Sequence, residues 1–356
     1  MDEFMKTDAA NPSDIAHLFI INPKSFLRKA DFDSIIPSIE NVFDHMEGCR
    51  YSAHISRYPR DAIGVVNRYI KGMPPKQPVR VYAVGGDGIL YDCLNAIAGN
   101  ENAELAPIPY GFENDFVRSF GEGREGAFRD IGKMARAPSI PADAIYCDGN
   151  YALNFCSVGI ESISVLWRNA LLKRYPNIKN MLKPPKSGLY YLTTFLGLLS
   201  EGLRSQQYGI TADGERLDGQ YAAIHIANGP CYGKTLTPSG ESLPDDGVLE
   251  LILCKKNTPF DTFRYLPVLG NGRHTDTRHQ CKNVFIHRRV RSLEISSDDP
   301  MTVCLDGEVY NDGGIKLRIL PGAVRIVVPD GARFHQRTKS KAYGNAVAPA
   351  ARADSN

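Results

Sequence analysis

Short apolar runs alternate with amphipathic stretches over the first third of the chain. The runs HLFII (17–21), VRVYAV (79–84) and LAPI (105–108) predict buried strands. The stretches 33–46, 59–70 and 89–97 carry apolar residues at helical spacing. Strands that alternate with helices form a parallel sheet wrapped by helices. We therefore expect an α/β domain over residues 15–137, after a disordered N-terminus at 1–14.

After residue 137 the pattern changes to short strands with period-two alternation and turn signals. Examples are AIYCDGNYALNFC (144–156), VLELILCK (248–255) and VRSLEISSDD (290–299). This pattern predicts a mainly antiparallel β domain over residues 138–318. A further strand, GAVRIVVP (322–329), follows it. Residues 332–356 are basic and rich in Ala, Gly, Pro and Ser, so we expect a disordered tail.

Composition sets limits on the class of protein. A chain of 356 residues with 43% hydrophobic content favours two domains. A net charge of +2 excludes a nucleic-acid binder driven by bulk charge. Eight cysteines without a C-x-x-C pair predict reduced, buried thiols in a cytoplasm. The polar N-terminus predicts no secretory signal, and the longest apolar stretch, 190–199, is too short to span a bilayer.

A glycine turn lies between the strand at 79–84 and the helix at 89–97. It reads Gly85-Gly86-Asp87-Gly88. Glycines at such a junction bring backbone N–H groups close to a ligand, and the helix N-terminus adds partial positive charge, which together favour a phosphate. A carboxylate beside a phosphate needs a divalent cation between them or serves as a base. Asp87 therefore indicates phosphoryl chemistry with Mg²⁺, although the four residues also suit an ordinary tight turn.

Four further motifs occur along the chain, one before the glycine turn and three after it. They are Asn22-Pro23-Lys24-Ser25, Pro109-x-Gly111-x-x-Asn114-Asp115-Phe116, Asp245-Asp246-Gly247 and Asp306-Gly307-Glu308. Over about residues 17–330 this set resembles the diacylglycerol kinase catalytic family, which includes bacterial lipid kinases and sphingosine kinases and is more distantly related to NAD kinases. The resemblance implies a two-domain fold: an N-terminal Rossmann-like nucleotide-binding domain, to which residues 319–330 return, and a C-terminal antiparallel β-sandwich domain.

The resemblance also implies roles for individual residues. ATP phosphates would contact Asn22, Pro23, Lys24, Ser25, Ser56, Gly85, Gly86, Asp87, Gly88, Gly111 and Asn114. Asp87 and Asp115 would lie where Mg²⁺ and ATP meet. Glu308 would take the proton of a lipid hydroxyl, with Asp306 shaping its turn. A structural Mg²⁺ would be held by the Asp246 side chain and the Leu243 and Val248 carbonyls.

Local alternatives exist for most of these motifs. Asn114 or Asp115 could cap a helix, Asp245-Asp246-Gly247 is a common turn, and Asp306-Gly307 is typical of a hairpin turn. The basic, apolar and aromatic segment 163–186, with Trp167, Arg168, Lys173, Arg174, Lys179, Lys183 and Lys186, suits either an anionic lipid surface or a solvated helix.

The predicted activity is ATP-dependent phosphorylation of diacylglycerol or a similar lipid, giving phosphatidic acid. We expect a cytoplasmic protein that binds its lipid at a membrane surface and has no nucleic-acid partner. The sequence leaves open whether the protein forms a homodimer. An NAD kinase and a degenerate lipid-binding or regulatory protein are the alternatives. The second is favoured by Ile89, Phe112 and Glu113, which stand where the family has two threonines and a small residue. Phe26, Glu161 and Lys234 also depart from the family pattern.

Overall fold

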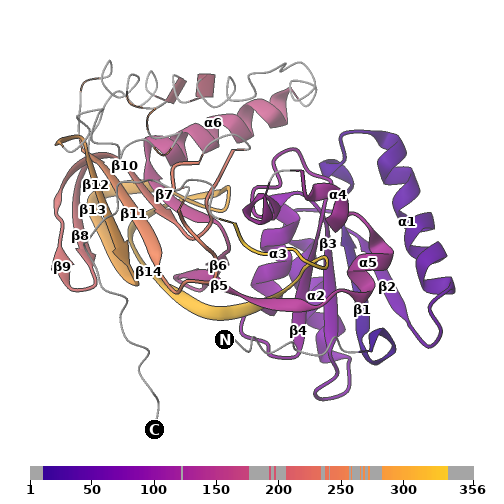
Figure 1. Cartoon of the computed structure of the whole chain (residues 1–356). Coiled ribbons are helices and arrows are strands. Elements are labelled where there is room, and N and C mark those ends of the chain that lie inside the picture. Colours follow the sequence, from indigo (N-terminus) through magenta and orange to yellow (C-terminus); the bar gives the residue numbers. More distant parts are fainter. Residues whose placement is uncertain are drawn as a thin grey trace, which may run out of the picture.

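The computed structural model describes residues 11–335, apart from residue 122, most of 176–205, residues 234–236 and 240, and most of 256–282. The chain forms an α/β half and a β-rich half (Figure 1). In the α/β half the parallel strands stand in the order β4-β3-β1-β2. Their bounds are β1 (Ala16–Ile21), β2 (Tyr51–Ile55), β3 (Val79–Gly85) and β4 (Ala103–Pro109).

Helices cover this sheet; the first three lie close to the predicted positions 33–46, 59–70 and 89–97, and the last two were not predicted. They are α1 (Lys29–Asp44), α2 (Asp61–Lys71), α3 (Asp87–Ile97), α4 (Glu125–Phe128) and α5 (Ile131–Arg136). Helix α2 packs on α3, and α1 packs on α5. In α1 the buried residues Ile35, Ile39 and Phe43 recur at spacing of four, so one face of the helix joins the core.

The β-rich half is mainly antiparallel, as predicted. It contains β5 (Ser139–Cys147), β6 (Asn150–Ala152), β7 (Phe155–Gly159), β8 (Gln206–Ala212), β9 (Glu215–Arg216), β10 (Gly219–Ala227), β11 (Leu249–Lys255), β12 (Phe285–Val290), β13 (Ser292–Leu305) and β14 (Glu308–Val327). The main strand order is β12-β11-β10-β7-β13-β14. Helix α6 (Ile160–Arg174) lies over this half and packs on β7 and β10 (Figure 1).

Strand β14 joins the two halves into one sheet. Its first part pairs with β13 and its last part pairs in parallel with β4, at Arg325↔Glu104 and Ile326↔Leu105. Figure 1 shows this strand passing from one half to the other. The predicted strand at 322–329 is the last part of β14, which starts earlier than predicted, at Glu308. The strand continues through an irregularity between Leu320 and Val324 in its pairing with β5.

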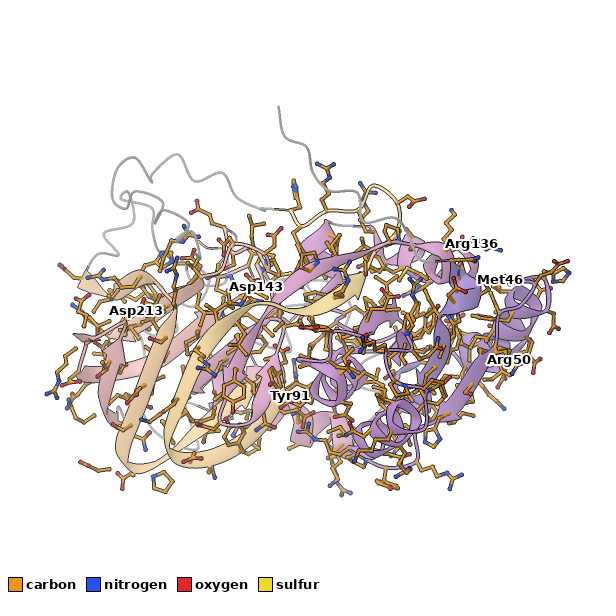
Figure 2. The ribbon with its side chains drawn as sticks, turned by 90° about the horizontal axis from the view of Figure 1, so that it is seen from below. Met46, Arg50, Tyr91, Arg136, Asp143 and Asp213 are labelled. Atoms are coloured by element: carbon orange, nitrogen blue, oxygen red, sulfur yellow. The ribbon has the colours of Figure 1, made fainter. Side chains whose placement is uncertain are left out.

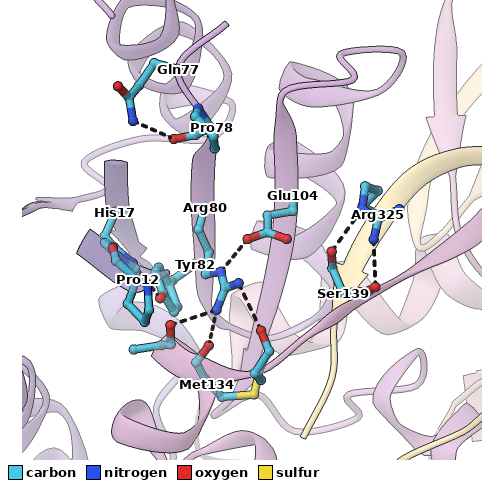
Figure 3. A network of polar contacts seen from close by, with 12 residues as sticks. Pro12, His17, Gln77, Pro78, Arg80, Tyr82, Glu104, Met134, Ser139 and Arg325 are labelled. Atoms are coloured by element: carbon cyan, nitrogen blue, oxygen red, sulfur yellow. Dashed lines mark hydrogen bonds and ion pairs between the residues drawn. The ribbon is translucent and has the colours of Figure 1, made fainter. Parts of the chain in front are cut away.

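A buried arginine braces the α/β half. The Arg80 side chain, 3% exposed, donates through Nε to Glu104 Oε1 at 2.6 Å. Its Nη1 donates to the Met134 and Ala135 carbonyls and its Nη2 to the Ala137 carbonyl (Figure 3). A buried charge is tolerated only when it is paired and hydrogen-bonded. Arg80 therefore ties β3 to the end of α5, where the chain leaves for the β-rich half.

Both ends of the described chain pack against the α/β half, contrary to the predicted disorder at 12–14 and 332–335. Pro12–Asp14 form a short 3-10 helix, and the Pro12 carbonyl hydrogen-bonds His17 Nε2. Phe334 stacks on Phe120 with ring centroids 4.6 Å apart. Apolar contact thus outweighs the polar composition of these short segments. The rest of both predicted disordered segments, 1–10 and 336–356, lies outside the described residues.

The cysteines and the lengths of the helices can be described for the residues given above. Among the described residues, seven cysteines carry thiols that are not joined in disulfides; six of these residues are buried and Cys49 is partly buried. No helix in the described part of the chain is long and apolar enough to cross a membrane.

Candidate functional site

The motifs that follow β1, β3 and β4 meet at one cavity of about 440 Å³ between the two halves. The α/β half contributes Asn22, Lys24, Ser25, Gly86, Asp87, Gly88, Leu90, Tyr91, Gly111, Phe112, Glu113, Asp115 and Phe116. The β-rich half contributes Leu153, Asn154, Phe155, Arg168, Asn169, Leu172, Tyr232, Gly233, Asp306, Gly307 and Glu308. Figure 2 shows Tyr91 of α3 where the halves meet, and its ring packs in the core of the β-rich half.

Two glycine loops touch at the floor of this site. A Cβ on Gly111 would lie 2.3 Å from Gly86 Cα, so only glycine fits there. Asn114 lies behind the contact and donates from Nδ2 to the Gly111 carbonyl at 2.9 Å. It fixes a loop and does not cap the short helix after it, whose N-cap is Phe116. The bare backbone beside the α3 N-terminus can therefore approach a phosphate closely.

Three carboxylates gather at the same place. Ligand atoms of Asp87, Glu113 and Asp115 lie within 4.8 Å of one another. Burial raises the pKa of Asp87 to about 6, and the charge of Glu113 adds to this rise. Asp115 accepts from the Gly233 N–H at 2.6 Å. Hard oxygen ligands at this spacing fit a divalent cation such as Mg²⁺. Asp87 and Asp115 were predicted for this role, whereas Glu113 was predicted only as a departure.

Arg168 of α6 supplies a positive charge to these carboxylates. Its Nη1 lies 2.9 and 2.7 Å from the two carboxylate oxygens of Glu113. The prediction that Arg168 belongs to a lipid-facing or solvated basic surface was wrong, because the side chain points into the cavity and is 18% exposed. Lys173 and Arg174 are exposed at the end of α6, while Lys179, Lys183 and Lys186 lie outside the described residues.

The turn between β13 and β14 carries the predicted catalytic residues. Asp306 and Gly307 have φ of 48° and 94°, as a two-residue hairpin turn requires. The Asp306 carboxylate accepts backbone N–H groups from Leu153 at 2.6 Å, Asn154 at 3.0 Å and Phe155 at 2.8 Å. Burial nevertheless raises its pKa to about 7. Asp306 thus anchors the turn that presents Glu308 to the cavity.

A smaller cavity of about 170 Å³ adjoins the first and shares Asn22, Lys24, Gly88 and Glu308 with it. Ser56, the predicted phosphate-contacting hydroxyl, lines this second cavity together with Arg57 and Arg60. The sequence prediction missed both arginines, because nothing in RYPR distinguishes them from surface residues. Pro23 and Gly85 line neither cavity; they shape the loops that do.

The departures from the family pattern also lie here. Ile89 is 2% exposed and lines the second cavity, while Phe112 lines the first. Glu161 is buried in α6, accepts from the Tyr232 hydroxyl at 3.1 Å and lies 2.9 Å from His225 Nδ1. Tyr232 reaches the cavity, so this buried network supports its wall. Phe26 stacks on Tyr110 beside the first loop, and Lys234 lies outside the described residues.

The three predicted ligands of a structural cation lie on a turn away from both cavities. The Asp246 N–H donates to the Leu243 carbonyl at 3.4 Å, and the Val248 N–H donates to Asp246 Oδ1 at 3.2 Å. Asp246 Oδ2 accepts from Arg289 Nη2 at 2.5 Å. A guanidinium thus already neutralises this carboxylate. A divalent ion bound by Asp246 would therefore have to displace Arg289 from this carboxylate.

Comparisons with known proteins agree with the motif order. The diacylglycerol kinase catalytic domain matches residues 16–146, and the YegS C-terminal NAD kinase beta sandwich-like domain matches residues 174–328. The probable lipid kinase YegS-like of Pseudomonas aeruginosa PAO1 is 30% identical over 256 residues, which cover 70% of this chain and 76% of that protein. The diacylglycerol kinase of Bacillus subtilis is 24% identical and covers 64% of this chain and 70% of that protein.

Solved structures share the fold. A diacylglycerol kinase from Bacillus anthracis superposes with a TM-score of 0.63 at 20% sequence identity. The match covers 89% of this chain and 98% of that chain.

Proposed function

Because the chain belongs to the diacylglycerol kinase catalytic family, we propose that it is an ATP-dependent lipid kinase that phosphorylates the hydroxyl of diacylglycerol to give phosphatidic acid. One observation carries the proposal: the Asp87, Glu113 and Asp115 carboxylates and the Glu308 side chain line the same 440 Å³ cavity. Phosphoryl transfer needs a phosphate cradle, ligands for a cation and a group that takes the acceptor's proton. This cavity brings candidates for all three together.

Each part of the cavity has a separate task in this reaction. The backbone of the Gly86 and Gly111 loops, with the α3 N-terminus, binds phosphate oxygens. Asp87, Glu113 and Asp115 hold Mg²⁺, which when bound neutralises charge on the transferred phosphoryl group. Glu308 accepts the hydroxyl proton while the lipid oxygen bonds to the γ-phosphorus and ADP departs. Asp306 keeps the Glu308 turn in place.

The residues of helix α6 favour binding of the lipid acceptor at a membrane surface. The helix lines the cavity with Arg168, Asn169 and Leu172. It also exposes Leu166 and Tyr175, by 49% and 56%, next to the exposed Lys173 and Arg174. Apolar and basic groups side by side suit anionic lipid. Vesicles that contain anionic lipid should therefore bind the wild type more strongly than a Lys173→Glu, Arg174→Glu variant, whereas equal binding would remove this surface from the proposal.

The function is tested by transfer of labelled phosphate from ATP to a panel of lipids in vesicles, with NAD as a further acceptor. We expect labelled phosphatidic acid and no labelled NADP. Glu308→Gln keeps the shape of the side chain but cannot take up the proton, so kcat should fall by a factor of about 10²–10⁴. Glu294→Gln is the matched control, since Glu294 is exposed and pairs with Lys316 in the β-rich half. Label in NADP alone would replace the lipid kinase with an NAD kinase.

A further inference from the structure

Arg60 has a backbone conformation that residues with a Cβ rarely adopt. It precedes α2 with φ of 67° and ψ of 4°, in the left-handed region. Its side chain makes no capping hydrogen bond to α2. A disfavoured conformation persists where the surroundings fix it, and such residues gather at functional sites. We therefore expect the Arg60 side chain to interact with residues of the functional site.

The Arg60 guanidinium connects α3 to the catalytic turn. It lies over the Tyr91 ring, 4.7 Å from the centroid. Nη1 is 3.3 Å from Asp92 Oδ1, and Nη2 is 3.4 Å from Glu308 Oε2. Tyr91 and Asp92 belong to the α/β half, whereas Glu308 begins β14. Two contacts on α3 thus fix the direction of the guanidinium, and the third contact reaches the Glu308 carboxylate of the β-rich half.

We propose that Arg60 is a positioning residue that holds the Glu308 carboxylate in the orientation needed to take the acceptor's proton; this rests on the function proposed above. The Glu308 side chain is 43% exposed, so packing alone leaves its rotamer free. A general base acts only within hydrogen-bond reach of the proton that it removes. Arg60 supplies the constraint that packing does not.

The solvent exposure of the Arg60 side chain allows a positioning role to be distinguished from a purely structural one. The Arg60 side chain is 42% exposed, and ion pairs between such exposed groups add little to stability. A purely structural role therefore predicts small effects on both melting temperature and turnover. A positioning role predicts a large loss of kcat without a loss of stability. ATP binding should change little, because Arg60 acts through Glu308.

The experiment compares Arg60→Gly, Arg60→Ala and Arg60→Lys with the wild type. Glycine adopts positive φ without strain, so Arg60→Gly keeps the fold while it removes the guanidinium. We expect kcat to fall at least ten-fold in the Gly and Ala variants, KM for ATP to change less than three-fold, and Lys to restore part of kcat. Arg216→Ala is the matched control, because it removes another exposed pair, with Asp218, at β9.

A double mutant shows whether Arg60 acts through Glu308. Glu308→Asp draws the carboxylate back by one methylene and keeps a base. Adding Arg60→Gly to this variant should then lower kcat by less than two-fold, because the contact is already lost. Undiminished kcat in Arg60→Gly, a loss confined to KM, or a full ten-fold loss in the Glu308→Asp background would each overturn the inference. A wild type without lipid kinase activity would instead refute the function on which it rests.

Discussion

Replacement of Asp306 by asparagine tests how the catalytic turn is held. The wild-type carboxylate accepts three backbone N–H groups, from residues 153–155. An asparagine has one acceptor oxygen, so its NH₂ group must face at least one of these donors. A hydrogen bond to a charged group contributes about 1.5–3 kcal/mol. We therefore expect Asp306→Asn to lower the free energy of unfolding by about 2 kcal/mol at pH 8, where the carboxyl is ionised, or the melting temperature by about 3 °C.

Chemical denaturation of both proteins at pH 5 and pH 8 measures this loss. The pKa of Asp306 is raised to about 7, above its ordinary value near 4. Between those values the native protein binds a proton that the unfolded chain releases. The wild type should therefore lose stability as pH rises from about 4 to 7, whereas the asparagine variant should not. The difference in the free energy of unfolding between the wild type and Asp306→Asn should thus be larger at pH 5 than at pH 8.

The control for this experiment is Asp298→Asn, an exposed aspartate in β13, the strand that ends just before the Asp306 turn. It should leave the free energy of unfolding within about 0.5 kcal/mol of the wild type. A deficit for Asp306→Asn that is no larger than this control value would refute the anchoring role. A deficit that grows with pH would show that the three N–H groups hold the carboxyl ionised and outweigh its burial.

Three further changes address the cation sites and the nucleotide. Arg289→Ala frees Asp246, so added Mg²⁺ should raise the melting temperature of this variant more than that of the wild type; an equal rise would mean that the two cations do not compete. Ile89→Thr supplies a hydroxyl beside the second cavity and should lower KM for ATP several-fold. Unchanged ATP affinity in a stably folded Ile89→Thr variant, measured by titration, would contradict this expectation. Glu113→Ala removes one of three clustered carboxylates and should raise the Mg²⁺ concentration for half-maximal activity; an unchanged requirement would exclude Glu113 as a ligand.

Local chemistry explains what could be predicted from the sequence. The helix at 89–97 and the strand at 79–84 follow from periodicity, and the glycine turn between them places Asp87 at the α3 N-terminus. Strand ends in a parallel sheet share one edge, so the meeting of Asp87 and Asp115 could also be expected. The two-residue turn at Asp306-Gly307 follows from the preference of such turns for positive φ.

The contacts that complete the site could not be predicted in this way. Arg60 meets Glu308 across 248 positions of sequence, and Glu113 meets Arg168 across 55. Neither pair shares an element, a motif or a period. An arginine at the surface of a helix or loop looks the same in sequence as one that points into a cavity. Such pairs arise from the packing of the two halves, which a one-dimensional pattern does not encode.

The shared strand has a consequence for synthesis of the protein on the ribosome. On the side of β4 that faces away from β3, Glu104 and Leu105 pair with Arg325 and Ile326, near the end of the described chain. More than two hundred residues must therefore be translated before this side of β4 is covered. An uncovered apolar strand edge invites pairing with other chains. Nascent chains that stall or are truncated before residue 325 would thus expose an adhesive edge in an otherwise complete N-terminal half.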